Sequence, residues 1–514
     1  MPSPASTFKA QGRADAPRWA VPVAAALSAS MAAAFFSLPA DDAYIVARYA
    51  VHAAAGHGIV YNEGEFINAL TSPMHLGVLL VLQPLAGAFV TLYRAICAIA
   101  VAAVLLTFAH RAWGRSRTAA HFLGLTLACP FVALWTVGGM ETPLLLCVCT
   151  ALAFLALRGE ARGAPWIVAL AAAAVLIRYD ASLFVAPVAL YTAWRHRLDA
   201  RVRIAASCGA LVVLVWLAFT LRYFGDLLPT SFYVKAGHAP GPRELGRGAL
   251  YVASFLCLTW IWLAVPTRMR PRSAAGRALG LGLALTFGYA LFASTVHMMY
   301  GFRLLVPFLP AMAAVLLASG GTLADRSRAA FPALLAWQAG LAAFIYFYSA
   351  NPSLALLVEG TSDASEQFEF SHLGARHTRA FLATAEGQAE AIREHWATTA
   401  AASTRAPRIV VSTGGLLPYL LPEAYVLEQL VSYRHRCKPA LEPLADYAQV
   451  IYDETNAEAI AGERIRQGRE LVARFTLTAD GLRAKPLPLA VEIWYRPSRA
   501  PIPLPPKVGE PCKA

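Results

Sequence analysis

The stretch WAVPVAAALSASMAAAFFSLPADDAYIVARYA, residues 19–50, decides the fold class. Residues 19–39 are almost entirely apolar and long enough to cross a bilayer as one helix. Asp41 and Asp42 follow where the chain leaves this run. Basic residues before the run are typical of a secretion signal. The length of the run, and the further apolar runs behind it, instead predict a retained first transmembrane helix.

Composition divides the chain into two parts. Of its 514 residues, 58% are hydrophobic and 15% are charged, whereas about a quarter are charged in an ordinary soluble protein. Long apolar runs dominate residues 1–350, which are expected to form a mostly α-helical transmembrane module. Residues 351–514 read as a soluble domain large enough to have its own core.

Apolar runs of spanning or near-spanning length predict a polytopic bundle of about 11 transmembrane helices. The runs cover residues 19–39, 88–110, 119–136, 142–157, 164–178, 181–194, 204–224, 246–265, 278–295, 304–319 and 329–349. Residues 74–87 are also apolar but end in Pro84 and Gly87, so they predict a juxtamembrane helix or an extension of the second span.

Basic residues are divided unequally between alternate loops. The N-terminal tail and the loops on its side hold 18 lysines and arginines, and the other short loops hold six. Cytoplasmic loops carry such an excess, so the pattern predicts a cytoplasmic N-terminus, a first outer loop at about residues 40–73 and an outer C-terminal domain. This bias accounts for the net charge of +13, and nucleic-acid binding is not expected.

The unusual sequences all fall in the predicted outer loops. They are DDAY from residue 41, GGMET at 138–142, RYD at 178–180, LPTSFYVK at 228–235 and HMMYGFR at 297–303. Charged residues at helix ends on one membrane face indicate a polar site at that interface.

Most of these charged residues also have a simpler interpretation. Asp41 and Asp42 could form a solvated helix end, and Glu141 could stabilise a helix N-terminus. Arg178 and Asp180 could pair with each other.

Lys235 and Arg303 are cations on the face where cations are scarce. They suit an anionic ligand such as a phosphate, and lipid head groups could also hold them. In the first outer loop, residues 43–55 predict a helix with Tyr44, Arg48 and His52 on one face.

The C-terminal part predicts an α/β domain. Strands are expected at 408–412, 449–452, 472–478 and 489–495, a helix at 378–399, and an extended segment at 501–506. Cys437 and Cys512 could pair if this domain lies in an oxidising compartment.

The first outer loop carries a family resemblance. The segments DDAYI at 41–45, RYA at 48–50, GHGIVYN at 56–62, GE at 64–65 and TSP at 71–73 resemble the first outer loop of bacterial GT-C glycosyltransferases. They look closest to the branch of mycobacterial terminal β-1,2-arabinofuranosyltransferases. Later segments are similar to blocks of that branch in the same order: GMET at 139–142, RYD at 178–180, LPTSFYVK at 228–235, GFR at 301–303, GGLLPY at 414–419 and ADY at 445–447.

The resemblance implies a GT-C-type bundle in the bacterial inner membrane, with a periplasmic C-terminal α/β domain. It implies inverting transfer of a sugar, with arabinofuranose as one candidate, from a polyprenyl-phosphate donor to a hydroxyl of a glycan, lipid or protein. Asp41 matches the catalytic base of the family. Asp42 could orient the acceptor or help to hold a divalent cation; no other cofactor is expected.

The remaining residues of these blocks are expected to bind the donor or another substrate. They are Tyr44, Arg48, His57, Asn62, Glu65, Thr71, Ser72, Glu141, Arg178, Asp180, Tyr233, Lys235 and Arg303. Two other functions remain open. A transporter or flippase of a lipid-linked sugar would need the same cations but no base, and a membrane-anchored scaffold would leave the outer motifs unexplained.

Overall fold

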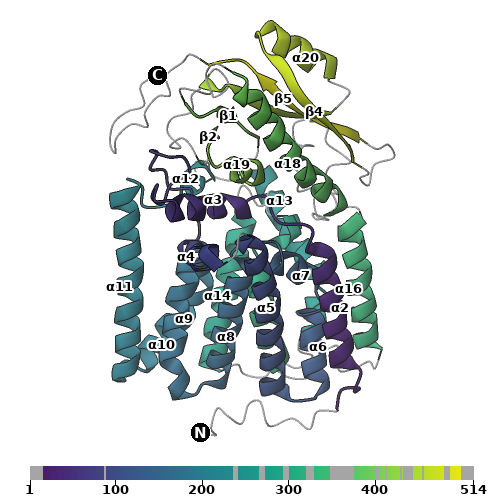
Figure 1. The fold of residues 1–514 in the computed structure, drawn as a ribbon. Coiled ribbons are helices and arrows are strands. Elements are labelled where there is room, and N and C mark those ends of the chain that lie inside the picture. Colours follow the sequence, from purple (N-terminus) through teal and green to yellow (C-terminus); the bar gives the residue numbers. More distant parts are fainter. Residues whose placement is uncertain are drawn as a thin grey trace.

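A computed structural model describes residues 15–85, 88–235, 241–265, 273–292, 300–319, 329–347, 375–399, 405–412, 414–428, 431, 444–453, 457–479 and 487–498. A bundle of helices forms one part of the molecule, and a five-stranded sheet lies beyond one end of the bundle (Figure 1).

The helices of the bundle follow the apolar runs of the sequence. They are α2 (Ala20–Phe35), α5 (Phe89–Trp113), α6 (Arg117–Leu125), α7 (Pro130–Thr136), α8 (Thr142–Arg158), α9 (Ala164–Ile177), α10 (Ser182–Arg195), α11 (Ala200–Tyr223), α13 (Pro242–Leu258), α14 (Ala274–Phe292), α15 (Leu309–Ala318) and α16 (Ala330–Phe347). Among the described residues, four helices are long and apolar enough to cross a membrane, or five if one bent pair counts as a span. The chain is a multi-pass membrane protein; the expected number of about 11 spans stays a prediction.

The bent pair corrects one expected element. Residues 119–136 read as a single span, but α6 and α7 meet at 60° across a short break. Pro130 starts α7 at a position where its missing N–H costs nothing, and it cannot continue α6. The sequence therefore folds as two short helices.

The first outer loop contains two helices. α3 (Ala43–Ala54) confirms the helix expected at 43–55. α4 (Pro73–Leu82), followed by a 3₁₀ turn (Gln83–Leu85), occupies most of the apolar stretch at 74–87. Ser72 caps α4 by accepting a hydrogen bond from the backbone N–H of His75 at 3.3 Å.

Short helices complete the bundle. They are α12 (Thr230–Lys235) and the 3₁₀ turns η2 (Ala161–Gly163), η3 (Tyr179–Ala181), η4 (Ile261–Ala264), η6 (Tyr300–Phe302) and η7 (Val306–Phe308). Several of them lie at the ends of longer helices, where the polar motifs of the sequence occur.

The sheet has the strand order β2-β1-β3-β5-β4. Its strands are β1 (Arg408–Val410), β2 (Tyr425–Leu427), β3 (Tyr447–Asp453), β4 (Glu470–Ala479) and β5 (Leu487–Tyr495). β1 pairs in parallel with β2 and β3, whereas β5 pairs antiparallel with β3 and β4. The four expected strands are confirmed, and β2 was not expected.

Three helices accompany the sheet. α18 (Ala375–Ala397), expected at 378–399, packs against β4 and against α19 (Leu416–Leu420), and α20 (Ala457–Arg466) leads into β4 (Figure 1). Cys437, Cys512 and the extended segment expected at 501–506 lie outside the described residues.

The two largest hydrophobic clusters among the described residues hold the molecule together. The larger lies among the helices of the bundle. The second joins the first outer loop to the C-terminal part, because Val46 and Tyr61 belong to the same buried cluster as Leu417, Val426 and residues of β3 and β5. The C-terminal part is therefore packed onto the loop at that end of the bundle.

Candidate active site

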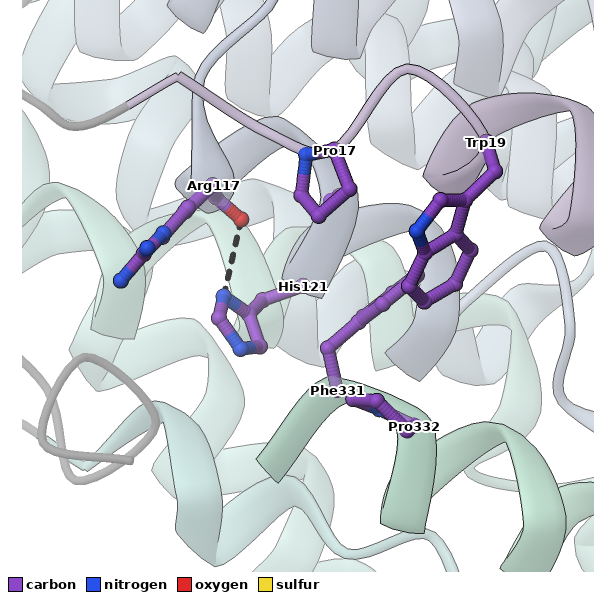
Figure 2. Close-up of a pocket in the computed structure, with 7 residues that line it drawn as sticks. Pro17, Trp19, Arg117, His121, Phe331 and Pro332 are labelled. Carbon is purple, nitrogen blue, oxygen red and sulfur yellow. Dashed lines mark hydrogen bonds between the residues drawn. The ribbon is translucent and has the colours of Figure 1, made fainter. Parts of the chain in front are cut away.

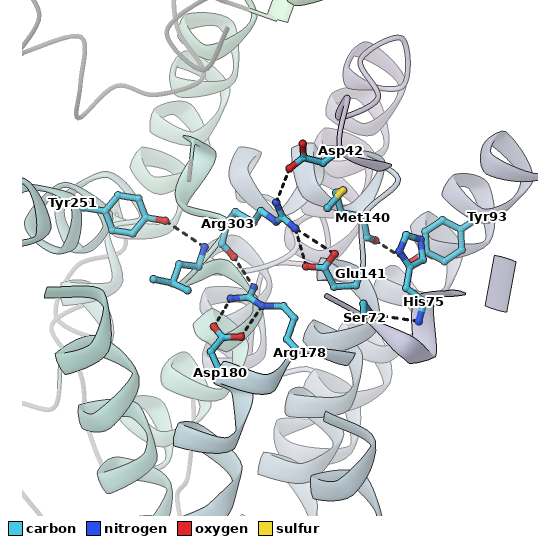
Figure 3. Close-up of polar contacts among 11 residues, drawn as sticks. Asp42, Ser72, His75, Tyr93, Met140, Glu141, Arg178, Asp180, Tyr251 and Arg303 are labelled. Atoms are coloured by element: carbon cyan, nitrogen blue, oxygen red, sulfur yellow. Dashed lines mark hydrogen bonds and ion pairs between the residues drawn. The ribbon is translucent and has the colours of Figure 1, made fainter. Parts of the chain in front are cut away.

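Arg303 is the centre of a charged cluster at the sheet end of the bundle (Figure 3). Its Nη1 lies 3.3 Å from Oδ2 of Asp42. Its Nη2 lies 3.0 Å from Oε1 and 3.3 Å from Oε2 of Glu141. One guanidinium group thus joins two acids that begin two different helices, α3 and α8.

A second ion pair, between Arg178 and Asp180, lies next to Arg303. Arg178 donates from Nε to Oδ1 of Asp180 at 3.0 Å and from Nη2 to Oδ2 at 2.5 Å. Its Nη1 donates to the backbone carbonyl of Arg303 at 3.2 Å. Tyr251 Oη accepts a hydrogen bond from the N–H of Leu304 at 3.2 Å. The peptide group between Arg303 and Leu304 is therefore held at both its carbonyl and its N–H.

The turn before Arg303 needs a special backbone. Gly301 has φ 55°, a conformation that favours glycine, and a Cβ there would lie 2.9 Å from Nε1 of Trp135. That indole N–H donates to the carbonyl of Gly301 at 2.8 Å, and the Arg303 guanidinium lies 5.6 Å from the Trp135 ring centroid. On the other side, the N–H of Ala40 donates to the carbonyl of Gly138 at 2.8 Å. These contacts bring the loops of Asp42, Glu141 and Arg303 together.

The two carboxylates on Arg303 differ in burial. The Glu141 side chain is 2% exposed, and that of Asp42 is 60% exposed. Burial would raise the pKa of Glu141, but Arg303 and Arg178 together lower it to about 2. Glu141 is therefore ionised at neutral pH. Three carboxylates and two guanidinium groups leave the cluster with one net negative charge.

Asp41 has a hydrogen-bond partner in the C-terminal part of the chain. Its Oδ1 accepts a hydrogen bond from the N–H of Leu416 at 2.8 Å, at the start of α19. Gly415 is packed so closely on Asp41 that a Cβ would overlap the backbone carbonyl and the carboxyl group of Asp41. The two adjacent acids thus have different partners, one in the C-terminal part and one on Arg303.

Several predicted binding residues lie instead at the interface between the first loop and the C-terminal part. Arg48 is buried, and its guanidinium donates to the carbonyls of Tyr61, Pro418, Leu421 and Ala424. A buried arginine whose donors are all directed at backbone carbonyls is a structural link between two segments.

Asn62 and Glu65 belong to the same interface. The Asn62 side chain exchanges two hydrogen bonds with the backbone of Val426, at 2.8 and 2.9 Å, and donates to Oε2 of Glu65 at 2.8 Å. Burial raises the pKa of Glu65 to about 8, although Asn62 and Tyr425 act in the opposite direction. Glu65 is thus held largely as a neutral acid at pH 7.

The remaining predicted residues are dispersed. Tyr44 packs against Tyr419, with 5.1 Å between ring centroids and the rings tilted by 46°. His57 pairs with Glu63 at 3.1 Å on the exposed part of the loop. Thr71 is half-buried beside the cap residue Ser72, and Tyr233 packs on its neighbour in α12. The side chain of Lys235 and residue His297 lie outside the described structure, so the role expected for Lys235 stays a prediction.

Sequence reasoning missed two buried polar residues next to the cluster. Arg94 of α5 donates to the carbonyls of Val137 and Phe36, which ties α5 to the ends of α7 and α2. The ring of His75 lies 4.8 Å from that of Tyr93, and neither ring nitrogen has a hydrogen-bond partner among the described residues. An arginine inside the apolar run at 88–110 was the available signal for Arg94.

No group of three or more His, Cys, Asp or Glu side chains is placed to hold a metal ion in the part of the chain that the structure describes. A divalent cation at Asp42 therefore has no further support from these residues.

A cavity of about 120 Å³ lies near the start of α2, α6 and α16 (Figure 2). Its lining comprises Pro17, Trp19, Arg117, Ala120, His121, Phe331 and Pro332. Ligand pockets usually measure about 300–1,000 Å³, so this cavity is too small for a lipid-linked sugar. It contains none of the predicted site residues.

The fold of the helical bundle and the C-terminal sheet has counterparts among solved structures. Two crystal structures of ArnT from Cupriavidus metallidurans share it. The apo structure has 16% sequence identity and a TM-score of 0.55, covering 92% of this chain and 97% of ArnT. The structure bound to undecaprenyl phosphate has 14% identity and a TM-score of 0.50, covering 92% and 98%. No family model and no curated protein sequence matches the chain.

Proposed function

We propose that this protein is a glycosyltransferase that moves a sugar from a polyprenyl-phosphate donor to a hydroxyl group of an acceptor. The observation that carries the proposal is the contact of Arg303 with Asp42 and Glu141, which puts an exposed carboxylate beside a cation at the end of the bundle. The shared fold adds support, because ArnT has been crystallised with undecaprenyl phosphate.

The proposed reaction is an inverting displacement. The acceptor oxygen attacks the anomeric carbon of the sugar, and the bond from that carbon to the phosphate oxygen breaks. Polyprenyl phosphate leaves with the electron pair, and the hydroxyl proton passes to a carboxylate. Arg303 stabilises the charge on the leaving phosphate. Lys235 lies in a family-like block and is proposed as a second cation at this phosphate.

We assign the base to Asp42 rather than to Asp41, the residue that the family motif suggests. The Asp42 side chain is 60% exposed and lies at Arg303, where the leaving phosphate is expected. Asp41 accepts a hydrogen bond from Leu416 and is covered by Gly415, so an acceptor hydroxyl has less access to it. Asp41 then orients the C-terminal part over the site.

The proposed location follows from the charges of the loops. The excess of 18 basic residues on one side over six on the other supports a periplasmic position, at a bacterial inner membrane, for the cluster and for the proposed C-terminal domain, residues 351–514. The acceptor is then a periplasmic glycan, lipid or protein. Arabinofuranose, the sugar that the sequence resemblance implies, is the first donor to test.

The test is an assay for polyprenyl phosphate release. Purified protein is incubated with a panel of polyprenyl-phosphate sugars and a mixed envelope fraction as acceptor, and released polyprenyl phosphate is measured by mass spectrometry. The expected result is release with at least one donor, and its loss in Arg303→Ala and Asp42→Asn. Arg393→Ala, which removes an exposed arginine of α18, is the matched control and should retain activity.

A flippase of the lipid-linked sugar is the competing function. It would need Arg303 but no base. Binding of the donor by wild-type protein, with no release for any donor and acceptor and with transport across vesicle membranes that survives Asp42→Asn, would decide for the flippase.

A further inference from the structure

We propose that Asp42 occupies Arg303 in the donor-free protein and that the donor phosphate takes its place, so that donor binding releases the base. This inference rests on the proposed function and adds an order of events to it. It concerns one side-chain contact, the 3.3 Å pair between Nη1 of Arg303 and Oδ2 of Asp42.

Asp42 is the more easily replaced of the two acids on Arg303. Glu141 is buried and has both carboxylate oxygens within 3.3 Å of the guanidinium. Asp42 contacts the guanidinium through one oxygen, at 3.3 Å, and is largely exposed to solvent. Exposed ion pairs contribute little, whereas removing one partner of a buried pair is strongly destabilising. An incoming anion will therefore displace Asp42 and leave Glu141 in place.

The charges of the described cluster also favour an exchange. Asp42, Glu141 and Asp180 outnumber Arg303 and Arg178, so the cluster already carries one net negative charge. A phosphate added to this set would meet repulsion from an acid at the same guanidinium. If Asp42 leaves, the four remaining side chains are neutral together, and Nη1 of Arg303 can bind a phosphate oxygen with a charge-assisted hydrogen bond.

The exchange links binding to chemistry. While Asp42 is bound to Arg303, one of its carboxylate oxygens is occupied by the guanidinium. Once the phosphate holds Arg303, both oxygens can receive the hydrogen bond of an acceptor hydroxyl beside the sugar that will react. The base is thus released only when the donor is present, which predicts donor binding before acceptor activation.

The experiment measures equilibrium binding of undecaprenyl phosphate, without a sugar, to the full-length protein in nanodiscs. Undecaprenol serves as the uncharged lipid. Asp42→Asn removes the competing charge and should tighten undecaprenyl phosphate binding by about two- to fivefold, the size expected for loss of an exposed ion pair. Arg303→Ala should weaken it. Glu63→Gln, which removes a charge from the same loop where the side chain is 74% exposed and paired with His57, should leave it unchanged.

The outcomes separate the two proposals. If wild-type protein does not bind undecaprenyl phosphate, or if Arg303→Ala binds it as tightly as wild type, the proposed function fails and the exchange with it. If wild-type protein binds undecaprenyl phosphate and Arg303→Ala binds it more weakly, but Asp42→Asn binds it no more tightly than wild type, only the exchange is wrong. Tightening of undecaprenol binding by the same factor, or equal tightening in Glu63→Gln, would also overturn it.

Discussion

Arg303 and Glu141 are 162 residues apart in the sequence, yet Nη2 of the first lies 3.0 Å from Oε1 of the second in a buried ion pair. The pair joins the turn before α15 to the start of α8. It also fixes the guanidinium that faces Asp42.

Glu141→Gln should destabilise the protein by about 3 kcal/mol, because it leaves a buried guanidinium with a partner lost. The pKa of Glu141 is lowered from 4.5 to about 2, so its contribution is fully present above pH 4.5 and is lost as the pH falls from there toward 2. Thermal unfolding in detergent should show that the difference in stability between Glu141→Gln and wild type is constant between pH 6 and 8.

The matched control for that variant is Glu160→Gln. Glu160 also pairs with an arginine, Arg158, at 2.7 Å, but both side chains are well exposed. This substitution should change stability by less than about 1 kcal/mol. Equal losses of stability in Glu160→Gln and Glu141→Gln would contradict the structural role of the Glu141–Arg303 pair.

Asp42→Asn should lower the rate of sugar transfer by about 10²- to 10⁴-fold, the usual contribution of a general base. Asp41→Asn should cost about tenfold or less, because it only weakens the hydrogen bond from Leu416. Turnover with saturating donor is the measurement. The opposite ranking would return the base to Asp41, as the sequence motif predicts.

Gly415→Ala should separate α19 from the first loop, because the new methyl group would overlap Asp41. The neighbouring Gly414 provides the control, since a Cβ there would meet Val431 and Tyr61 at 3.6–3.7 Å, an ordinary contact distance. Hydrogen exchange of the backbone at residues 414–421 should rise in Gly415→Ala and not in Gly414→Ala. Similar exchange in both variants would refute the close packing.

Arg48→Met should loosen the C-terminal part from the loop, because it leaves buried carbonyls of residues 418–424 without donors. Limited proteolysis should then cut near these residues faster than in wild type. Arg393→Ala removes an exposed arginine that contacts the same segment and should have a much smaller effect.

Glu65→Gln should make stability less dependent on pH. Burial raises the pKa of Glu65 from 4.5 to about 8. Between these pH values the Glu65 carboxyl is ionised in the unfolded chain but stays largely protonated in the folded protein, so stability falls as the pH rises from about 4.5 to 8. The variant should therefore gain melting temperature over wild type at pH 8 and little at pH 5. An equal difference at both pH values would show that Glu65 is ionised in the fold.

Long, strongly apolar elements were predictable from the sequence. The helix at α11 and the strands β4 and β5 follow directly from runs and alternation of apolar residues. The short β2 and α19 were not predictable, because three to five residues carry no periodic signal and depend on partners far along the chain. To predict the bend between α6 and α7, Pro130 would have to be interpreted as the start of a helix rather than as a residue within a span.

The site was predictable only in part. Charge at helix ends drew attention to Asp42, Glu141 and Arg303, which the structure brings into contact. The resemblance of the first outer loop to known blocks implied ligand binding by Arg48 and Glu65, and a polar loop seen alone gives no sign that another segment covers it. Their partners lie in a segment that begins at residue 414, and no local pattern connects the two.

The contact of Arg48 with the carbonyls of residues 418–424, some 370 positions later, also bears on how the protein is made. During synthesis the first loop emerges long before the segment that completes it. Arg48 then has no carbonyls to bind, and Asp41 has no Leu416. The end of the molecule that carries the proposed site is therefore completed last, after almost the whole chain has been translated and inserted. A chain that ends prematurely, even one with every transmembrane helix in place, would stay inactive.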